Sequence, residues 1–380
     1  MNILNVNMSL DPVTGGGSAE RTLQISRALN RAGHRCTILA MDTGISPAYW
    51  QQWRQWGLTV VALPSLCKRF YLPKPSQHLV RELVSGADVV NLMSHWTLIN
   101  VMAYRAARQL AKPYTVCPAG TLAIFGRSKV LKRLYNDLMG RKIILHADGC
   151  IAISRNEIDQ FKSYGVQGSE ITIIPNGINL SDFPETDGKE FRTRYCIGDS
   201  PLILFVGRLN IIKGPDMLLE AFLRCRQDDR MKRYHLVFAG PDGGMLNALQ
   251  RRVEDTGTED RIHFIGHIGH DEKSDAYRAA DFLAIPSRRE AMSIVVLEAG
   301  ISGTPVLVTD QCGFDDVAAV AGGMVVGASV EGLQEGLLGM TGNPAQLKVM
   351  GHNLEHFTRG QFLWDIMVKR YLELFSKITC

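Results

Sequence analysis

Long apolar runs are missing from this sequence of 380 residues, because no stretch approaches the roughly 18–20 apolar residues that span a bilayer. Its eight cysteines are scattered without a C-x-x-C pair or a cysteine–histidine cluster, which excludes an obvious zinc site and favours a reducing cytoplasm. Residues 1–12 hold no basic leader and no long apolar core, so we expect no signal peptide. The composition is that of a globular protein, and the length fits two domains of roughly 150–200 residues.

Net charge is low at +4, but it is unevenly distributed. Residues 1–180 hold 20 Lys or Arg against 10 Asp or Glu, a net charge of +10, and the remainder holds 22 against 28, a net charge of −6. Basic and apolar residues mix in segments 67–77 and 125–147, and the second segment is predicted to be an amphipathic helix. Such segments lie on anionic membrane surfaces, with a solvated helix face as the alternative. We find no nucleic-acid-binding motif and expect no nucleic acid as a partner. The basic residues of the predicted helix are Lys129, Lys132, Arg133, Arg141 and Lys142.

Short β-rich runs alternate with helical stretches along the chain, as in parallel sheets that helices cover on both faces. One expected helix is capped by Ser18 and ends at Gly33. The polar stretch 179–191 marks a boundary, so we expect two doubly wound, Rossmann-like domains, 1–180 and 181–361, that face each other across a cleft. The expected strands are 2–7, 36–41, 58–63, 88–93, 114–117, 150–154 and 171–175 in the first half and 202–207, 235–240, 261–266, 282–287, 305–310 and 323–327 in the second.

Two cations follow the expected strand 202–207. Arg208 comes directly after the strand, and Lys213 precedes a helix that Gly214 and Pro215 open. Cations at the carboxyl end of a strand and beside a helix N-terminus suit an anion with several oxygens, such as a diphosphate. The stretch matches neither the nicotinamide fingerprint nor the P-loop. Two solvated surface cations are the alternative.

Two glutamates follow the expected strand 282–287. Glu290 lies in its exit loop, and Glu298 lies among apolar residues on an expected helix that Ser293 caps and that ends near Ser302. A buried carboxylate needs a partner, and Glu298 can accept two hydrogen bonds from a vicinal diol such as ribose. A salt bridge to a neighbouring helix is the alternative. Amides at the start of this helix form a second candidate anion site. They belong to Met292, Ser293 and Ile294.

Together these motifs resemble the retaining family-4 glycosyltransferases of the GT-B fold. Each motif is weak alone, but five in the right order are specific, and the resemblance extends along most of the chain. The sequence of residues 289–316 resembles that of bacterial enzymes that build lipopolysaccharide, O-antigen or capsular polysaccharide. The motifs are the glycine loop and helix at 15–34, the segment 173–179, Gly207-Arg208 with Lys213-Gly214, the strand 261–268, and Pro286-Ser287 with Glu290-x7-Glu298 and Gly303-Thr304-Pro305-Val306.

The resemblance implies transfer of a hexosyl unit from a UDP- or GDP-linked sugar to a saccharide acceptor, expected to be lipid-linked, at the inner face of the cytoplasmic membrane. Arg208 and Lys213 would hold the diphosphate, Glu290 would contact the donor sugar, and Glu298 would bind the ribose. No D-x-D motif is evident in a suitable loop, so we expect neither a metal nor a further cofactor. The remaining implied donor-binding residues are Gly16, Gly17, Gly266, His267 and Ile268.

The resemblance also implies that a C-terminal helix, 362–380, crosses back to the first domain. The segment 360–378 is amphipathic, and its apolar residues are able to form one face. A helix confined to the second domain is the alternative. The apolar residues are Phe362, Ile366, Tyr371, Leu374 and Phe375.

One departure from the family concerns the first domain. Many members have a histidine at the end of a strand where this chain has Ala119. His95 follows another strand and is the candidate base or acceptor ligand, with a histidine satisfied inside a loop as the alternative. The departure admits a degenerate partner that binds sugar nucleotides without turnover. A glycosidase also uses two carboxylates, but hydrolysis of a neutral glycoside has no diphosphate for Arg208 and Lys213 to hold.

Overall fold

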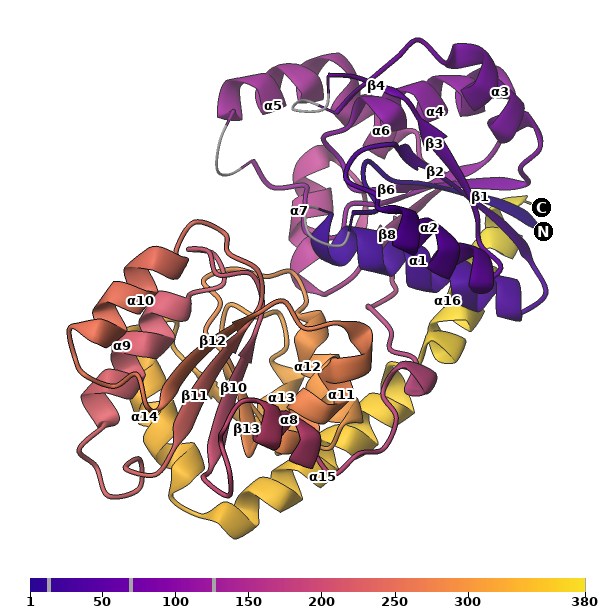
Figure 1. The fold of residues 1–380 in the computed structure, drawn as a ribbon. Coiled ribbons are helices and arrows are strands. Elements are labelled where there is room, and N and C mark those ends of the chain that lie inside the picture. Colours follow the sequence, from indigo (N-terminus) through magenta and orange to yellow (C-terminus); the bar gives the residue numbers. More distant parts are fainter. Residues whose placement is uncertain (12–14, 68–70, 125–127, 380) are drawn as a thin grey trace. The chain divides into compact units, whose positions relative to one another are not determined.

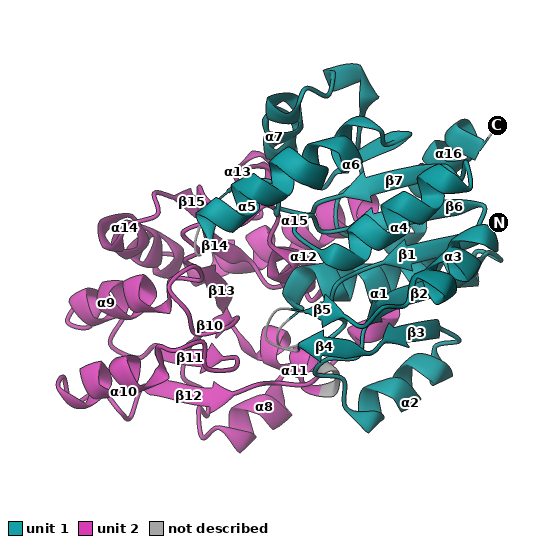
Figure 2. Cartoon of the chain, turned by 90° about the horizontal axis from the view of Figure 1, so that it is seen from above, with its two compact units in different colours: residues 1–177, 364–380 teal, residues 178–363 magenta. Residues whose placement is uncertain are grey.

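The computed structural model divides the chain into two compact units (Figure 2). Unit 1 comprises residues 1–177 and 364–380, and unit 2 comprises residues 178–363. The chain therefore passes between the units twice, a few residues from the boundaries that the sequence suggested. Within unit 2 the two flanking segments pair, because Ile178 N donates to Phe362 O at 2.8 Å. The structure describes residues 1–11, 15–67, 71–124 and 128–379.

Unit 1 is built on a seven-stranded parallel sheet with the order β3-β2-β1-β6-β7-β8-β9 (Figure 1). Its central strands are almost entirely buried, which agrees with the near-continuous apolar runs from which they were expected. Each strand expected in this half is present. The strands are β1 (Asn2–Val6), β2 (Arg35–Met41), β3 (Thr59–Leu63), β6 (Val89–Met93), β7 (Tyr114–Cys117), β8 (Gly149–Ala152) and β9 (Ile171–Ile173).

Two short strands of unit 1 were not expected. β4 (Ser65–Cys67) and β5 (Leu72–Pro73) form a small antiparallel pair. They lie in and beside the basic segment 67–77, of which residues 68–70 lie outside the described residues. The strands are too short for a period-of-two pattern to predict them.

The helices of unit 1 lie between successive strands along the chain, except α16, which is the last element. α1 begins two residues before Ser18, so Ser18 is not its N-cap, and its hydroxyl instead donates to Gly15 O at 3.1 Å. Gly33 follows the helix with φ of 86°, a conformation that suits glycine at a helix stop. The helices are α1 (Gly16–Arg31), α2 (Pro47–Gln55), α3 (Gln77–Ser85), α4 (Leu98–Gln109), α5 (Lys129–Tyr135), α6 (Arg141–Leu145), α7 (Asn156–Tyr164) and α16 (Trp364–Thr379), with a 3-10 turn at η3 (Gly168–Glu170).

The predicted amphipathic helix 125–147 is found as three consecutive segments. α5 and α6 flank a π-helical turn, η2 (Asn136–Gly140). Residues 125–127 of the prediction lie outside the described residues. Such a turn inserts one extra residue, so it changes the phase of the helix between its two halves.

α16 belongs to unit 1, as the resemblance implied. It packs against α1, and the buried Arg21 of α1 donates to Tyr371 OH at 2.9 Å. The expected face is partly right, since Ile366 is only half-buried and Phe362 precedes the helix, in unit 2. The buried residues of α16 are Trp364, Met367, Val368, Tyr371, Leu374 and Phe375.

Unit 2 is built on a six-stranded parallel sheet with the order β12-β11-β10-β13-β14-β15 (Figure 1). Each strand expected in this half is present, and the prediction of two doubly wound α/β sheets is confirmed. The strands are β10 (Leu202–Val206), β11 (His235–Ala239), β12 (Ile262–Gly266), β13 (Phe282–Ile285), β14 (Val306–Thr309) and β15 (Gly323–Val326). The helices are α8 (Lys189–Arg194), α9 (Pro215–Cys225), α10 (Leu246–Glu254), α11 (His270–Ala279), α12 (Ile294–Ile301), α13 (Asp316–Ala319), α14 (Val330–Thr341) and α15 (Pro344–Gln361), with a 3-10 turn at η4 (Leu180–Asp182).

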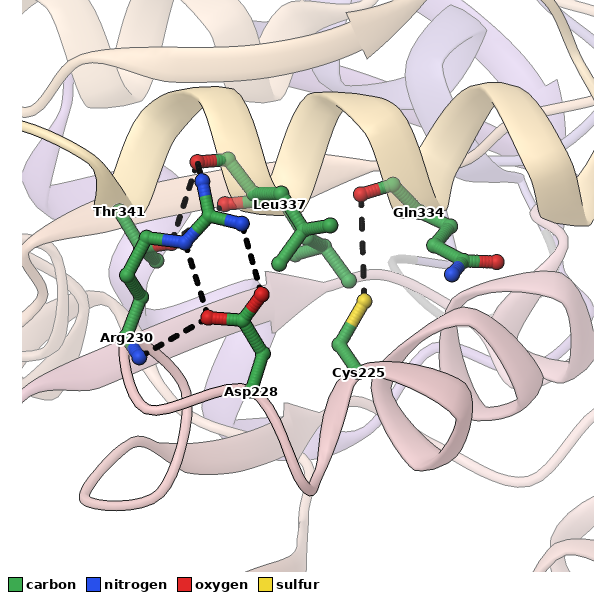
Figure 3. Close-up of polar contacts among 7 residues, drawn as sticks. Cys225, Asp228, Arg230, Gln334, Leu337 and Thr341 are labelled. Carbon is green, nitrogen blue, oxygen red and sulfur yellow. Dashed lines mark hydrogen bonds and ion pairs between the residues drawn. The ribbon is translucent and has the colours of Figure 1, made fainter.

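α14 is held against the end of α9 by polar contacts that involve its backbone (Figure 3). Cys225 Sγ lies 3.9 Å from Gln334 O, and Arg230 donates to Leu338 O at 3.2 Å. Asp228 orients Arg230 through an ion pair of 2.7 Å, and this partner lowers the pKa of Asp228 to about 2. These contacts fix α14 to the end of α9 and to the loop that leads into β11, at the amino-terminal edge of the sheet. No helix among the described residues combines the length and the apolar character that a bilayer crossing requires.

Candidate functional site

The strand order of unit 2 contains one switch point. β10 and β13 are neighbours, but the chain leaves β10 toward β11 and β12 and returns to β13 on the other side. Ligands of open parallel sheets bind outside the carboxyl ends of the strands at such a point. Arg208 and Lys213 follow β10, and Glu290 follows β13, so all three lie in the loops of this switch point.

The loops after β10 and β13 touch because one of them has no side chain at the contact. Gly214, the N-cap of α9, has a left-handed φ of 69°, and a Cβ there would lie 2.1 Å from Pro286 O. Any other residue would therefore push the two loops apart. Gly214 thus brings the residues after β10 against the residues after β13.

Lys213 and Glu290 form an ion pair where these loops meet. Lys213 Nζ lies 2.7 Å from Glu290 Oε2, and the Ser287 hydroxyl donates to Glu290 Oε1. The side chains are 30% and 11% exposed, respectively, so a ligand can reach the pair. A diphosphate bound to Lys213 in place of Glu290 would leave the carboxylate nearby as an acceptor for hydroxyl groups. The structure therefore joins two residues that the sequence assigned to different parts of one ligand.

Arg208 leaves β10 on the side of β11. A Cβ at Gly243, in the loop after β11, would lie 2.9 Å from Arg208 Cγ, so the arginine stem packs against this glycine. The backbone is held as well, because Leu209 N donates to Pro241 O at 3.0 Å. Arg208 and Lys213 therefore flank the switch point, with Arg208 toward β11 and Lys213 toward β13.

A second ion pair, which the sequence analysis missed, ties the two loops together. Arg288 donates to both carboxylate oxygens of Asp216, at 2.8 and 2.6 Å, and to Ile211 O at 2.7 Å. Its own amide donates to Ile212 O at 2.7 Å. Bidentate arginine–carboxylate pairs constrain geometry as well as charge. Arg288 therefore fixes the loop that holds Lys213, from a position two residues before Glu290.

Glu298 has partners within the protein. Its side chain is 7% exposed, Lys273 Nζ of α11 donates to Oε1 at 2.7 Å, and Tyr277 OH donates to Oε2 at 2.5 Å. Burial and the neighbouring carboxylate raise the pKa of Tyr277 well above its usual value, so the phenol keeps its proton. The alternative of a salt bridge to a neighbouring helix is therefore what the structure shows. A ribose ligand would have to share or exchange these contacts.

The start of α12 differs from the expected anion site. Ser293 is the N-cap, as predicted, but its hydroxyl makes no capping bond and has no partner within the described part of the chain. Its amide donates to Cys312 O at 3.2 Å, so this amide is not directed to a ligand. Met292 is buried, and Ile294 begins the helix. The prediction that all three amides face a ligand is wrong for Ser293, because the loop after β14 occupies its amide.

The end of β12 lies beside the same edge of the sheet. Gly266 O accepts from Gly240 N at 2.6 Å, which links this end to the loop after β11. Gly266 and His267 are exposed, whereas Ile268 is buried. The implied donor-binding residues Gly266, His267 and Ile268 are thus adjacent to the loop against which Arg208 packs.

In unit 1, the predicted glycine loop leads into α1. Gly16 and Gly17 are the first residues of the helix, and a Cβ at Gly16 would meet no atom of the described residues within 4 Å. The glycine that the packing requires is Gly15, where a Cβ would lie 2.6 Å from Ala19 Cβ and 2.7 Å from Asp11 O. The space around Gly16 is compatible with the close approach of a ligand. Residues 12–14 of this loop lie outside the described residues.

His95 is enclosed rather than presented at a surface. It is 2% exposed, its ring lies edge-on to Trp96, Tyr135 and Tyr164, and its Nε2 lies 2.9 Å from Asn136 Oδ1. Burial lowers its pKa to about 4 despite the bond to Asn136. A neutral, enclosed imidazole of this kind is a poor general base. The structure therefore favours the alternative of a histidine satisfied inside a loop.

The loop that contains Ala119 is held by a carboxylate that the sequence did not single out. Ala119 has a left-handed φ of 49°, and the next amide, that of Gly120, donates to Glu157 Oε1. Glu157 is fully buried and also accepts from Ile153 N at 2.7 Å. Burial raises the pKa of Glu157. This strained loop follows the carboxyl end of β7 and contains Ala119, the position at which many family members have a histidine. Among the described residues, no group of three or more His, Cys, Asp or Glu side chains could hold a metal ion.

Comparisons with known proteins agree with this architecture. Residues 15–182 match the family described as Glycosyltransferase Family 4, and residues 189–355 match the family described as Glycosyl transferases group 1. The solved structure of HepE from Anabaena in complex with UDP-glucose has a TM-score of 0.82 and 17% identity, with 99% of this chain and 100% of that chain covered. The lipopolysaccharide glycosyltransferase WaaG has a TM-score of 0.68 and 20% identity, with 97% and 98% covered. These structures share the fold.

Curated relatives are more similar in sequence. The D-inositol 3-phosphate glycosyltransferase of Gordonia bronchialis is 31% identical over 251 residues, which are 62% of this chain and 54% of that protein. The chain thus spans about half the length of this relative. The mannosylfructose-phosphate synthase of Agrobacterium fabrum is 31% identical over 328 residues, which are 77% of this chain and 71% of that protein. With one family match on each half and this relative covered over most of its length, the chain belongs to the GT-B glycosyltransferases of family 4 and group 1.

Proposed function

We propose that the protein is a retaining glycosyltransferase that moves a hexosyl unit from a nucleotide-diphosphate sugar to a saccharide acceptor. The observation that supports this most directly is the Lys213–Glu290 pair at the β10/β13 switch point, with Arg208 on its other side. This set offers two cations for a diphosphate and one carboxylate for sugar hydroxyls. A uridine nucleotide is the first choice, because the structural neighbour HepE is solved with UDP-glucose.

The chemistry follows from where charge develops. As the bond between the anomeric carbon and the diphosphate oxygen breaks, negative charge accumulates on the leaving diphosphate. Fixed cations at that position stabilise the transition state more than the ground state. Arg208 and Lys213 supply this stabilisation in the proposal, so the reaction needs no metal ion. Glu290, released from Lys213, orients the donor sugar through its hydroxyl groups.

The proposed acceptor is a lipid-linked saccharide of cell-surface polysaccharide biosynthesis. The basic first half of the chain supports it, because an acceptor in an anionic leaflet requires a basic protein surface. The proposal places the protein at the inner face of the cytoplasmic membrane, with segments 67–77 and 125–147 as the contact. The relatives named for inositol phosphate and mannosylfructose phosphate make a phosphorylated small acceptor the main competitor.

A second candidate is a partner protein that binds sugar nucleotides without turnover. The enclosure of His95 and the presence of Ala119 favour it, since neither supplies an exposed imidazole at these strand ends of unit 1. The ion-paired Lys213 and Glu290 favour the enzyme, because a polar pair at a switch point suits a reaction that separates charge.

One experiment separates these possibilities. Thermal shift with UDP, GDP, ADP and their hexose conjugates identifies the nucleotide, because a bound ligand raises stability by mass action. Turnover is then measured with the stabilising donor and two acceptors, a lipid-linked saccharide and a soluble sugar phosphate. Stabilisation without turnover on either acceptor would support the binding partner. The absence of stabilisation by every nucleotide sugar would overturn both proposals.

A further inference from the structure

Exposed large apolar side chains are concentrated on one stretch of unit 1. Between residues 129 and 145, five such residues are 49–79% exposed, whereas the others in the described residues are spread over several loops and helices and one short strand. A cluster of this kind on a protein surface usually marks an interaction site. The five residues are Val130, Leu131, Leu134, Leu138 and Leu145, and we call the last four the leucine stripe.

The stripe follows one face of the helix. Leu131, Leu134 and Leu138 are spaced by three and four residues, which places them on one face of α5 and η2, and the exposed Leu145 follows on α6, beyond the π-helical turn. The opposite face is docked on unit 1, because Ile143 and Ile144 belong to its hydrophobic core. Figure 1 shows α5 at the edge of unit 1. The leucines therefore point outward because the opposite face of the segment packs against the core of unit 1.

Polar contacts fix this orientation. Tyr135 OH donates to His95 O at 2.8 Å, Asn136 Nδ2 donates to Tyr164 OH at 2.8 Å, and Tyr114 OH donates to Ile143 O at 2.8 Å. These bonds anchor the segment at two levels, one at Tyr135 and Asn136 and the other at Ile143. His95 thus takes part in holding the segment, through the bond of its carbonyl and the bond of its ring to Asn136. Rotation that would bury the leucines would break this network.

Cations border the leucine stripe. Residues 129–145 contain five basic residues and one acidic residue, Asp137. Two of the basic residues, Arg141 and Lys142, are exposed on α6, and Lys129 and Arg133 are exposed on α5. Exposed apolar side chains and exposed cations on one segment match the charge and polarity of the headgroup region of an anionic bilayer.

We propose that the leucine stripe inserts into the headgroup–acyl boundary of an anionic membrane while the flanking cations contact lipid phosphates. This inference deepens the proposed function, on which it rests for its biological use, by naming the element that enters the lipid. It also differs from a purely electrostatic contact in one measurable way. Charge attraction is screened by salt, whereas burial of leucine in acyl chains is not.

The test uses sedimentation with vesicles of phosphatidylglycerol and phosphatidylcholine, and with pure phosphatidylcholine, at low and at high salt. We expect the full-length protein to retain binding to the anionic vesicles at high salt. Leu131→Ser, Leu134→Ser and Leu138→Ser together should lower the partition coefficient at high salt at least tenfold. Val349→Ser, which changes an equally exposed side chain on α15, is the matched control and should leave binding unchanged.

A second measurement reports insertion directly. Leu134→Trp should gain blue-shifted fluorescence that brominated acyl chains quench, and Val349→Trp should not. Equal binding by the triple serine variant and the parent at high salt, or an unquenched signal from bound Leu134→Trp protein, would overturn the proposal. The alternative is that a second copy of the chain binds the leucine stripe. Size-exclusion chromatography tests it, because the parent protein would then be a dimer and the triple serine variant a monomer, which would contradict the proposal.

The outcome is independent of catalysis. Donor stabilisation and turnover on a soluble acceptor do not involve the leucine stripe, so the serine variant should keep both. Absence of insertion by the parent protein with intact turnover would contradict this inference alone. Insertion without any response to nucleotide sugars would contradict the proposed function alone.

Discussion

At the scale of single residues, Glu298 shows what a sequence can and cannot predict. A carboxylate among Ile, Val and Leu requires a partner whatever the fold, and the structure supplies two donors. The identity of these donors was not predictable, because Lys273 and Tyr277 reach Glu298 only when α11 and α12 pack together. The same holds for the pair of Lys213 and Glu290, which lie 77 positions apart in the sequence.

The role of Glu298 is open to a direct test. If it binds ribose, Glu298→Ala should weaken binding of the stabilising nucleotide by about 1.5–3 kcal/mol, the contribution of hydrogen bonds to a charged group. Binding of the free base should hardly change. Lys273→Met provides the control, because it removes the ion-pair partner and keeps the carboxylate. Isothermal titration decides the matter: equal nucleotide affinity in the Glu298→Ala variant assigns the residue to structure alone.

Arg208 and Lys213 are tested by turnover. Arg208→Ala should lower kcat by on the order of 10²–10³, the effect of removing one partner of a transition-state charge. The fold should persist, because the half-buried arginine lies in a loop rather than in the core. Circular dichroism checks folding, and initial rates with the identified donor check activity. Near-normal rates in the folded variant would remove Arg208 from the site.

His95 predicts a dependence of stability on pH. Its pKa is about 4 in the folded protein and 6.5 in the reference state, so only the unfolded chain takes up the proton between these values. Stability should therefore fall as pH decreases through this window, by up to ~1.4 kcal/mol per pH unit, and the contribution should level off below it. In urea titrations, His95→Gln should show a shallower decrease from pH 6.5 to pH 4. The exposed His352, changed to Gln, is the control for loss of an imidazole. An unchanged slope in His95→Gln would contradict the burial of this ring.

At the scale of elements, strands were predictable and helix ends were not. Runs of four to six mostly apolar residues predicted the strands of both sheets, because buried parallel strands are apolar on both faces. α1 starts at Gly16 instead of after Ser18, and its N-cap, Gly15, packs closely against Asp11 O, a contact that the helix pattern does not contain. The π-helical turn η2 left no signal in the pattern, and its first residue, Asn136, bonds to His95 and Tyr164, which are distant in the sequence.

The connection between the loops after β10 and β13 is the element-scale prediction. Arg288→Met should release the loop that holds Lys213 and lower kcat/KM by up to about 10²-fold, the cost of misplacing a group by an ångström. Asp216→Asn should have a similar effect, and the double variant should be no worse than either. A double-mutant cycle then gives a coupling of about 0.5–3 kcal/mol, as found for residues in contact.

The control for this cycle is the ion pair between Arg224 and Glu331, whose N–O distance is 2.7 Å. It joins α9 to α14 and does not involve the loops of the switch point. Arg224→Met should leave kcat/KM unchanged, because an exposed ion pair contributes little. Additive effects of Arg288→Met and Asp216→Asn would show that the two residues act separately.

At the scale of the whole molecule, the charge asymmetry was visible in the sequence, and its surface was not. The net charges of +10 and −6 follow from composition, but the exposed leucines of α5 and η2 depend on which helix face docks on the core. When a helix has apolar residues on two faces, the sequence pattern alone does not predict which face packs against the core and which stays exposed. The apolar residues of this segment that are buried in the core are Ile143 and Ile144.

The basic helix gives the prediction for the whole protein. A lipid-linked acceptor stays in its leaflet, so the half of the protein that binds it must approach the membrane, while a soluble donor makes no such demand. Each Lys or Arg near an anionic surface contributes roughly 1 kcal/mol, and salt screens this contribution. The protein should therefore sediment far more with anionic vesicles than with zwitterionic ones at low salt, and added salt should release the electrostatic part of this binding. Changing Lys129, Lys132 and Arg133 together to Glu should abolish binding, because reversed charges repel the surface before the leucines can insert. Activity on a short soluble acceptor should survive, since the helix lies outside the β10/β13 switch point. Vesicle binding that persists in this variant would exclude the helix as the contact, and absence of binding by the parent protein would favour a soluble acceptor.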